Sequence, residues 1–312
     1  MIQDRWKGLA RKRAALPRGV VHDVLEMEKP SSSLRSDKKG GWIYTTDGGP
    51  QVMLTKTIRY KTDAGETREI SQTSLFTWTS KMTCASFSLP AGPPRYGGTC
   101  PASAEKFDCD YKDVICYDCY ATRNRYLFAS NAIRQAVKWQ WVQTAMRRGT
   151  FVDEMVEAIR FISQPSVAQY LRGRDIEANY FRIHDSGDWS DKDYFRAWVE
   201  VCRRVPEVRF WAPTRMWIFE DWADLLKKTR FPKNMTVRPS TLCKEEMPFI
   251  IKGLSGAGAG VSYDELPSPA YNCPATFGED SDTCLGSRGP DEQHGCRACW
   301  DWPSLIVNYR RH

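Results

Sequence analysis

The sequence predicts an α/β fold, either a partial (β/α) barrel or an open parallel sheet, with cysteine-rich metal-binding loops and a small N-terminal β-hairpin region. Beyond residue 126, short apolar segments typical of strands alternate with amphipathic segments typical of helices. This alternation indicates parallel βαβ units, in which helices cover the sheet. A hairpin pattern precedes it, and two groups of cysteines lie before and after it.

The first elements in chain order are the hairpin and two helices. Residues 51–60 and 69–79 place apolar side chains at alternating positions and flank 62–65, a turn-like segment that contains Asp63 and Gly65. Apolar spacing then predicts helices over residues 126–148 and 152–163.

The alternating region begins with a strand at residues 180–184. Ser190 is predicted as the N-cap of the next helix, with Asp193 as the acid three positions later. The glycine-rich segment 253–260 lacks the Lys-Ser/Thr of a phosphate-binding loop and is predicted as a flexible connection. The remaining elements expected are strands at 208–212, 234–238 and 261–263, and a helix at 217–228.

Residues 1-50 are predicted as a basic, partly irregular N-terminal extension, and residues 51-312 as a single α/β metal-binding domain. The chain has 312 residues and a formal net charge of +7, which suits contact with nucleic acid without requiring it. A nucleic-acid-binding arm and a solvated helix both fit the N-terminal basic residues. No apolar run approaches the roughly 18 residues of a membrane span, and the N-terminus does not resemble a secretion signal. We therefore expect no membrane contact and a cytoplasmic location.

Eight of the eleven cysteines form two compact groups, at residues 100–119 and 273–299, and each group ends in Cys-x2-Cys. A two-residue gap lets a turn direct both sulfurs toward one metal ion. Reduced thiols in a cytosolic protein are more often ligands than disulfides, so we predict that both groups bind metal. The predicted ligands are Cys100, Cys109, Cys116, Cys119, Cys273, Cys284, Cys296 and Cys299. The other three, Cys84, Cys202 and Cys243, are predicted to be structural.

The spacing of the cysteines does not distinguish an iron-sulfur cluster from a zinc site. Cys109, Cys116 and Cys119 are suitably spaced to bind three irons of a 4Fe-4S cluster. Cys100 or a cysteine of the second group would then bind the fourth iron. A four-cysteine zinc site uses the same residue type and similar gaps. The second group fits zinc or a further 4Fe-4S cluster equally, and the two groups could also share one centre.

Polar side chains follow three of the predicted strands. In parallel α/β folds, ligands bind at the carboxyl ends of strands, so we predict a pocket there. Four residues are expected to be catalytic, namely His184, Asp185, Asp188 and Arg215. Three more are expected to bind an anionic substrate, namely Arg182, Arg238 and Ser240. The alternative is a hydrogen-bonded loop in which the aspartates cap helices and the arginines pair with acids.

Several segments together resemble the phage Gene product 88 domain family, in the same order over about residues 80 to 300. The resemblance implies a phage or prophage origin, hence the host cytoplasm, and cysteine-bound metal, but no particular reaction. The matching segments are Ser86 to Gly92, Thr99-Cys100-Pro101, Cys119-Tyr120-Ala121, Phe181 to Asp188, Val208 to Arg215, Cys273-Pro274 and Cys296-x2-Cys299.

The loop from Cys109 to Ala121 is also similar to a cluster loop in phage proteins related to radical S-adenosylmethionine enzymes. This second resemblance implies a 4Fe-4S cluster on three cysteines beside a partial (β/α) barrel, with S-adenosylmethionine as a further ligand. The spacing here, Cys-x6-Cys-x2-Cys, departs from the usual Cys-x3-Cys-x2-Cys of those enzymes.

Three functions follow from these observations. The first is a phage-type iron-sulfur protein, acting by redox or radical-SAM-like chemistry on a small or nucleotide-like substrate. The second is a non-enzymatic module whose fold is stabilised by a bound zinc ion or iron-sulfur cluster and which binds nucleic acid or a host protein. The third is a metal-dependent hydrolase that works through His184, Asp185 and Asp188.

Overall fold

The computed structural model of the chain describes part of the sequence, and Cys109 and Cys284 lie outside that part. The described residues are 2–14, 35–36, 42–43, 56–61, 67–72, 75–78, 82, 84–105, 113–164, 178–277 and 296–311.

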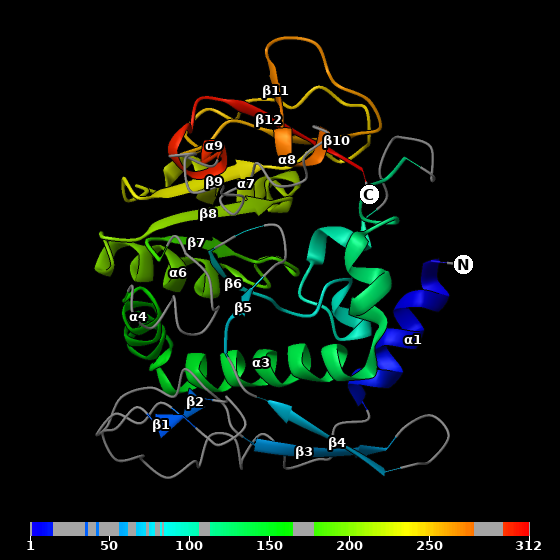
Figure 1. Cartoon of the computed structure of the whole chain (residues 1–312). Helices are drawn as coiled ribbons and strands as arrows, with labels where there is room; N and C mark the ends of the chain where they lie inside the picture. Colours follow the sequence, from blue (N-terminus) through cyan, green and yellow to red (C-terminus); the bar gives the residue numbers. More distant parts are fainter. Residues whose placement is uncertain are drawn as a thin grey trace.

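The centre of the fold is a five-stranded sheet with the order β5-β6-β7-β8-β9 (Figure 1). Strands β6 to β9 run parallel and stand in chain order, whereas the short β5 is antiparallel to β6. This confirms an α/β protein with a parallel sheet, and the described strands form no closed barrel. The strands are β5 (Thr77–Trp78), β6 (Ala85–Phe87), β7 (Tyr180–Ile183), β8 (Arg209–Thr214) and β9 (Met235–Pro239).

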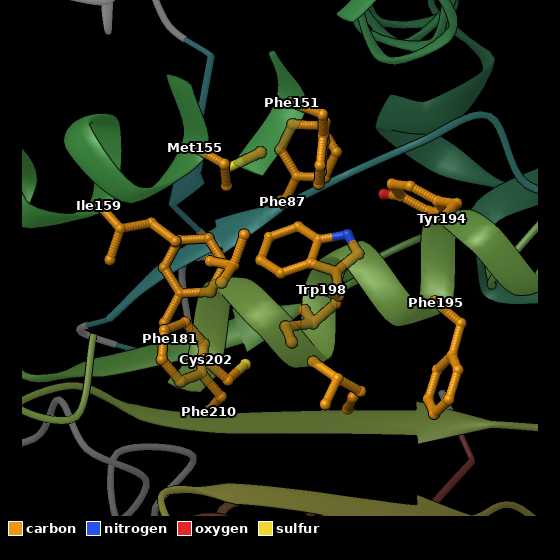
Figure 2. Packing of buried hydrophobic residues seen from close by; sticks show 14 of the residues in the cluster. Phe87, Phe151, Met155, Ile159, Phe181, Tyr194, Phe195, Trp198, Cys202 and Phe210 are labelled. Atoms are coloured by element: carbon orange, nitrogen blue, oxygen red, sulfur yellow. The ribbon is translucent and has the colours of Figure 1, made fainter. Parts of the chain in front are cut away.

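Helices connect the parallel strands and bury one face of this sheet. The helices are α3 (Ala129–Arg148), α4 (Phe151–Ile162), α6 (Lys192–Arg204) and α7 (Glu220–Lys228). Their apolar residues join those of the strands in one core cluster, and Trp198 of α6 lies at its centre beside Phe87, Phe151 and Phe181 (Figure 2). The indole of Trp198 is fully buried, so this core fixes the sheet against the helices.

A second, smaller sheet with the order β10-β12-β11 covers the opposite face (Figure 1). All three strands are parallel, and an isolated parallel bridge from Ser240 to Ala259 joins this sheet to the end of β9. The elements of this region are β10 (Ala259–Ser262), β11 (Ala270–Asn272), α8 (Pro274–Phe277), α9 (Ala298–Asp301) and β12 (Ile306–Arg310).

The glycine-rich segment ahead of β10, predicted as a flexible connection, is closely packed. A Cβ atom at Gly258 would lie 2.4 Å from the carbonyl oxygen of Phe249, and one at Gly256 would lie 2.8 Å from that of Val237. Glycine is therefore required there because neighbouring backbone approaches too closely for any side chain.

Arg238 of β9 fastens the C-terminal region to the sheet. Side chains alternate along a strand, so Val237 enters the helical core while Arg238 points to the opposite face. The guanidinium is completely buried and donates to five backbone carbonyls at 2.5–3.2 Å, those of Ala257, Ala298, Cys299, Trp302 and Leu305. All five N–H donors of the side chain are thus used within the protein.

The structure contains the predicted N-terminal hairpin but begins helix α6 at a different N-cap. The N-terminal hairpin is present as β3 (Lys56–Lys61) antiparallel to β4 (Thr67–Gln72), and a minor pair consists of β1 (Arg35–Ser36) and β2 (Trp42–Ile43). The prediction of Ser190 as a helix N-cap is wrong. Asp191 caps α6 instead, and its carboxylate accepts from the backbone N–H of Tyr194 at 2.8 Å. A carboxylate suits this position because its charge also faces the positive end of the helix dipole.

The N-terminal helix α1 (Ile2–Ala14) packs against the loop that follows β6. Trp6 and Leu9 are buried there with Ala91 and Ala121. A Cβ atom at Gly92, which has a φ of +103°, would lie 2.4 Å from the Trp6 ring. Among the described helices, none is long and apolar enough to cross a membrane.

Candidate metal centre

The described cysteines of the first group lie at the carboxyl edge of the parallel sheet, where the loops after the strands meet. The loop after β6 bonds to the loop after β7, with the Leu89 N–H donating to the Ser186 carbonyl at 2.9 Å. The segment 113–119 bonds to the chain after β9, with the Ile115 N–H donating to the Leu242 carbonyl at 3.0 Å. Backbone from four separate parts of the chain therefore frames this site.

Three described thiols, Cys100, Cys116 and Cys119, make up what we call the first thiol group. For each of them a neighbouring polar group lowers the pKa of the thiol and partly offsets the effect of burial. These groups are the backbone at Gly92 for Cys100, the guanidinium of Arg215 for Cys116, and the backbone at Ala121 for Cys119. Polar groups near sulfur favour thiolates and are one of the ways in which proteins tune bound iron-sulfur clusters.

Desolvation and mutual repulsion keep these thiols protonated at neutral pH. Burial raises the pKa of Cys119 to about 11, and the neighbouring Cys116 adds to that shift. Burial likewise raises the pKa of Cys100, with the Asp188 carboxylate as the next cause. The pKa of Cys116 is raised by burial against the opposing effect of Arg215. A cation bound by these sulfurs would have to displace their protons.

Asp188 and Arg215, both predicted as catalytic, stand beside the first thiol group. The buried Asp188 carboxylate accepts from the Trp189 N–H and the Thr214 hydroxyl at 2.8 Å, and from the Arg215 N–H at 3.0 Å. The Arg215 Nε atom donates to the Thr241 carbonyl at 2.8 Å. Asp188 thus fixes the backbone of Arg215, and Thr241 orients its side chain toward Cys116.

Asp185 and Arg182 pair with each other. The Arg182 Nη1 atom lies 3.0 Å from the Asp185 Oδ1 atom, and the Tyr126 hydroxyl donates to the Oδ2 atom at 2.6 Å. The Tyr120 hydroxyl donates to the backbone carbonyl of Asp185. The Arg182 guanidinium stacks on the Trp211 ring, 4.7 Å from its centroid. This network joins the loop that carries Cys119 to the face of the sheet opposite the helices.

His184, predicted as catalytic, lies in the aromatic core on the helical side. Its side chain is 2% exposed, its Nε2 atom is 3.0 Å from the Tyr194 hydroxyl, and its ring contacts those of Trp189 and Trp198. Burial lowers the pKa of His184 to about 3, and the charge of Arg182 contributes to the shift. The imidazole is therefore neutral at physiological pH, and its φ of +62° marks the sharp turn after β7.

Asp118, between Cys116 and Cys119, anchors the cysteine loop through three cations. Its carboxylate pairs with Arg123 and Arg311, and its Oδ2 atom lies 3.0 Å from the Nζ atom of the buried Lys244. The C-terminal end of the described chain is thereby attached to the first thiol group.

The described cysteines of the second group lie on the face of the sheet opposite the helices. Three of its members, Cys273, Cys296 and Cys299, make up what we call the second thiol group. Cys296 raises the pKa of Cys273, and both of these thiols raise the pKa of Cys299. Burial raises the pKa of Cys299 to about 12. The Cys299 Sγ atom is 3.0 Å from the Tyr309 hydroxyl, and the Cys296 Sγ atom is 3.4 Å from the Tyr271 hydroxyl.

The structure brings together only some of the predicted site residues. The first thiol group, Asp188 and Arg215 meet at the carboxyl edge, with Asp185 and Arg182 beside them. The side chain of Arg238 is instead directed into the C-terminal region. Ser240 is 7% exposed, and its backbone bonds to Thr214 and to the Trp217 indole. Among the residues that the structure describes, no three or more His, Cys, Asp or Glu residues are arranged to hold a metal ion.

Sequence reasoning missed three residues near these sites. Cys84, predicted to be structural, lies in the same buried cluster as Cys273 and Cys299. Cys243, which is disulfide-bonded, pairs with Val114 in a β-bridge beside the first thiol group. The position of Asp118 inside Cys-x2-Cys was visible in the sequence, but its three cationic neighbours come from distant segments.

Comparison with known proteins identifies relatives by sequence. The model of the Gene product 88 family matches residues 53–301. A Gene 88 protein of Mycobacterium phage L5 is 28% identical over 123 residues, which are 36% of this chain and 45% of that protein. The match therefore spans less than half the length of that relative. No solved structure matches the chain.

Proposed function

The chain belongs to the Gene product 88 family, and from that premise we propose that it is a phage-type iron-sulfur protein. In this proposal the first thiol group, together with Cys109, binds one 4Fe-4S cluster at the carboxyl edge of the parallel sheet. Cys109 lies outside the described residues, so its part in the site rests on the sequence spacing alone.

The observation that carries the proposal is the closeness of the three described thiols at the carboxyl edge of the sheet. Cys100 and Cys119 pack against the same buried cluster, and Cys116 adds to the rise in the pKa of Cys119. Cysteine thiolates are the usual ligands of iron-sulfur clusters, and polar groups near their sulfurs help to set the reduction potential. The backbone at Gly92 lowers the pKa of Cys100, and the backbone at Ala121 lowers the pKa of Cys119. Arg215 adds a positive charge beside Cys116. These groups fit a cluster that carries negative charge.

A 4Fe-4S cluster bound here would supply one-electron transfer, and the residues of this chain would control its surroundings. The positive charge of Arg215 favours the Cys116 thiolate, and Asp188 holds the backbone of Arg215 in position. Asp185 and Arg182 pair with each other beside Cys119 and would hold the loop that carries this ligand in place. S-adenosylmethionine is the co-substrate to test first, because the loop from Cys109 to Ala121 is similar to that of radical-SAM-related phage proteins.

The test is the iron, zinc and acid-labile sulfide content of the full chain purified without oxygen. We expect brown protein with about four irons and four sulfides per chain, and loss of both in Cys116→Ala. Cys202→Ala is the matched control, because Cys202 is fully buried among apolar residues of the helical core. Full iron in Cys116→Ala, or colourless wild-type protein with zinc alone, would refute the assignment.

A zinc-stapled module that binds nucleic acid or a host protein is the second candidate. Helix α1 buries Trp6 and Leu9 and exposes Lys7 and Arg11, so it presents a basic surface beside the first thiol group. Colourless, zinc-containing protein with salt-sensitive DNA binding would favour this candidate. The hydrolase has less support, because Asp188 already accepts three hydrogen bonds and His184 lies in the aromatic core.

A further inference from the structure

Helix α1 directs two cations away from the core. The side chains of Lys7 and Arg11 are exposed, whereas those of Trp6 and Leu9 are buried. Positions four apart lie on one face of a helix, so Lys7 and Arg11 are neighbours. Neither of these two side chains forms an ion pair with another described residue. The outer face of α1 is therefore positively charged.

Two further arginines lie on short 3-10 helices beside α1. The helices concerned are η1 (Pro94–Tyr96), η3 (Tyr120–Thr122) and η4 (Asn124–Leu127). Helix α1 contacts η1 and η3, and η3 contacts η4. Arg95 of η1 and Arg125 of η4 are exposed, and within the described part of the chain neither forms an ion pair. Four exposed cations thus come from adjoining elements.

Two aromatic side chains on the same segments are also exposed. Tyr120, in η3, is 46% exposed, and Phe128, between η4 and α3, is 60% exposed. The hydroxyl of Tyr120 donates to the backbone carbonyl of Asp185, so this ring is held in position. Exposed aromatic rings beside cations provide flat faces on which unpaired bases can stack.

Acidic residues are nearly absent from the sequence of this region. Residues 85–104 and 119–152 contain no Asp or Glu, and α1 contains only Asp4. These three segments hold twelve Lys and Arg residues, a formal net charge of +11, whereas the whole chain has +7. The rest of the chain is therefore net negative, at −4. Charge segregated in this way produces a local field that attracts polyanions.

We propose that this region binds a single strand of nucleic acid. In this interaction the cations contact successive phosphates, and the exposed rings stack on bases. Because every base has a flat face, binding of this kind tolerates many sequences. The residues that make up what we call the α1 surface are Lys7, Arg11, Arg95, Tyr120, Arg125 and Phe128.

The exposed rings favour a single strand over other polyanions. In a duplex the bases are already stacked on one another, and an acidic protein has no bases, so neither of them could stack on Phe128. Both could still contact the four cations. Comparison of the three ligands therefore separates a stacking surface from a merely basic one.

This inference goes beyond the proposed cluster and does not depend on it. Cys100 and Cys119 pack against the buried cluster that contains Trp6, so the α1 surface adjoins the first thiol group without including its sulfurs. Cys116→Ala should lose iron and keep strand binding. Wild-type protein that binds the strand but no iron would refute the cluster and leave this inference standing.

The experiment measures binding of a labelled oligo(dT) strand of about 16 nucleotides to the full chain by fluorescence anisotropy at several salt concentrations. Each phosphate contact with a single strand adds about 0.7 to the slope of log Kd against log salt. Four contacts predict a slope of about 2.8, or a rise in Kd of about 50-fold from about 50 to 200 mM salt. A Kd for duplex DNA or for poly-glutamate as low as that for oligo(dT) would overturn the proposal.

Two variants separate the cations from the rings. Replacing the four cations of the α1 surface by Gln should abolish most of the salt dependence. Phe128→Ala should raise Kd about fivefold or more and leave the slope unchanged. Unchanged binding in either variant would contradict the proposal. The substituted side chains are all exposed, so both variants should retain the Tm of the wild type.

Matched controls lie at the other side of the sheet. Four exposed cations around the end of α7 give a variant with the same loss of charge, and Trp302, at 53% exposure, gives Trp302→Ala as the aromatic control. Both controls should bind the strand almost as the wild type does, and an equal loss of binding in the charge control would refute the α1 surface. The substitutions in the charge control are Lys227→Gln, Lys228→Gln, Arg230→Gln and Lys233→Gln.

Discussion

Arg238→Lys is expected to lower the free energy of unfolding by about 4 kcal/mol. Lysine keeps the positive charge but offers three donors on one nitrogen, whereas the arginine fork offers five. Five backbone carbonyls accept from Arg238, so at least two of them lose their donor. A hydrogen bond to a charged group contributes about 1.5–3 kcal/mol, and two such losses give the expected value.

The assay is urea unfolding monitored by tryptophan fluorescence, with thermal unfolding as a second reading. A loss of about 4 kcal/mol corresponds to a decrease in Tm of roughly 10 °C for a domain of this size. Limited proteolysis should cut the variant first within residues 257–305, because the acceptors of Arg238 lie in that range.

The matched control is Arg209→Lys. Arg209 also contacts the C-terminal region, through Asp301 at 3.2 Å, but its side chain is 52% exposed. An exposed ion pair contributes about 0–1 kcal/mol, so this variant should unfold almost as the wild type does. Equal stabilities of Arg238→Lys and Arg209→Lys would refute the role assigned to Arg238.

Two further predictions concern the backbone at Gly92 and the buried amine of Lys138. Gly92→Ala should cost about 3 kcal/mol, because the new methyl group meets the Trp6 ring and the positive φ adds strain. Gly149→Ala, at φ +71° with open space around it, should cost only about 1 kcal/mol. Equal losses of unfolding free energy for the two variants in urea would contradict the clash with Trp6 at Gly92. Burial lowers the pKa of Lys138 to about 7, well below its ordinary value. Between pH 7 and about 10 the unfolded chain holds this proton and the folded chain does not, so stability should rise with pH by up to about 1.4 kcal/mol per unit. Lys138→Met should remove that rise and stabilise the protein most at pH 7. An unchanged dependence of the unfolding free energy on pH in the variant would contradict the assignment of the rise to Lys138.

The sequence was a good guide to elements that depend on local pattern. The 3.6-residue and two-residue periods located α3, α4, α6 and β7 to β9, because each element buries a continuous apolar face. The order of β7, β8 and β9 also follows from the pattern, since one α-helix connects each strand to the next and such crossovers favour adjacent pairing.

The sites were harder to predict, because they depend on which face of the sheet a later segment covers. Arg238 and Arg182 lie near the carboxyl ends of their strands as a substrate-binding arginine would, yet the described residues 257–277 and 296–311 cover the face toward which both point. His184 follows β7 closely enough to suggest catalysis, but its positive φ turns the ring back into the aromatic core. Nothing local in the sequence shows that Cys84 adjoins Cys299.

The anchoring of Asp118 by Arg311 has a consequence for biosynthesis. These residues are 193 positions apart. The cysteine loop is therefore synthesised long before Arg311, which holds it in place through Asp118. Parallel pairing between distant segments also delays folding, because loop closure must precede the stabilising contacts. The first thiol group can therefore reach its final arrangement only after residue 311 has been translated.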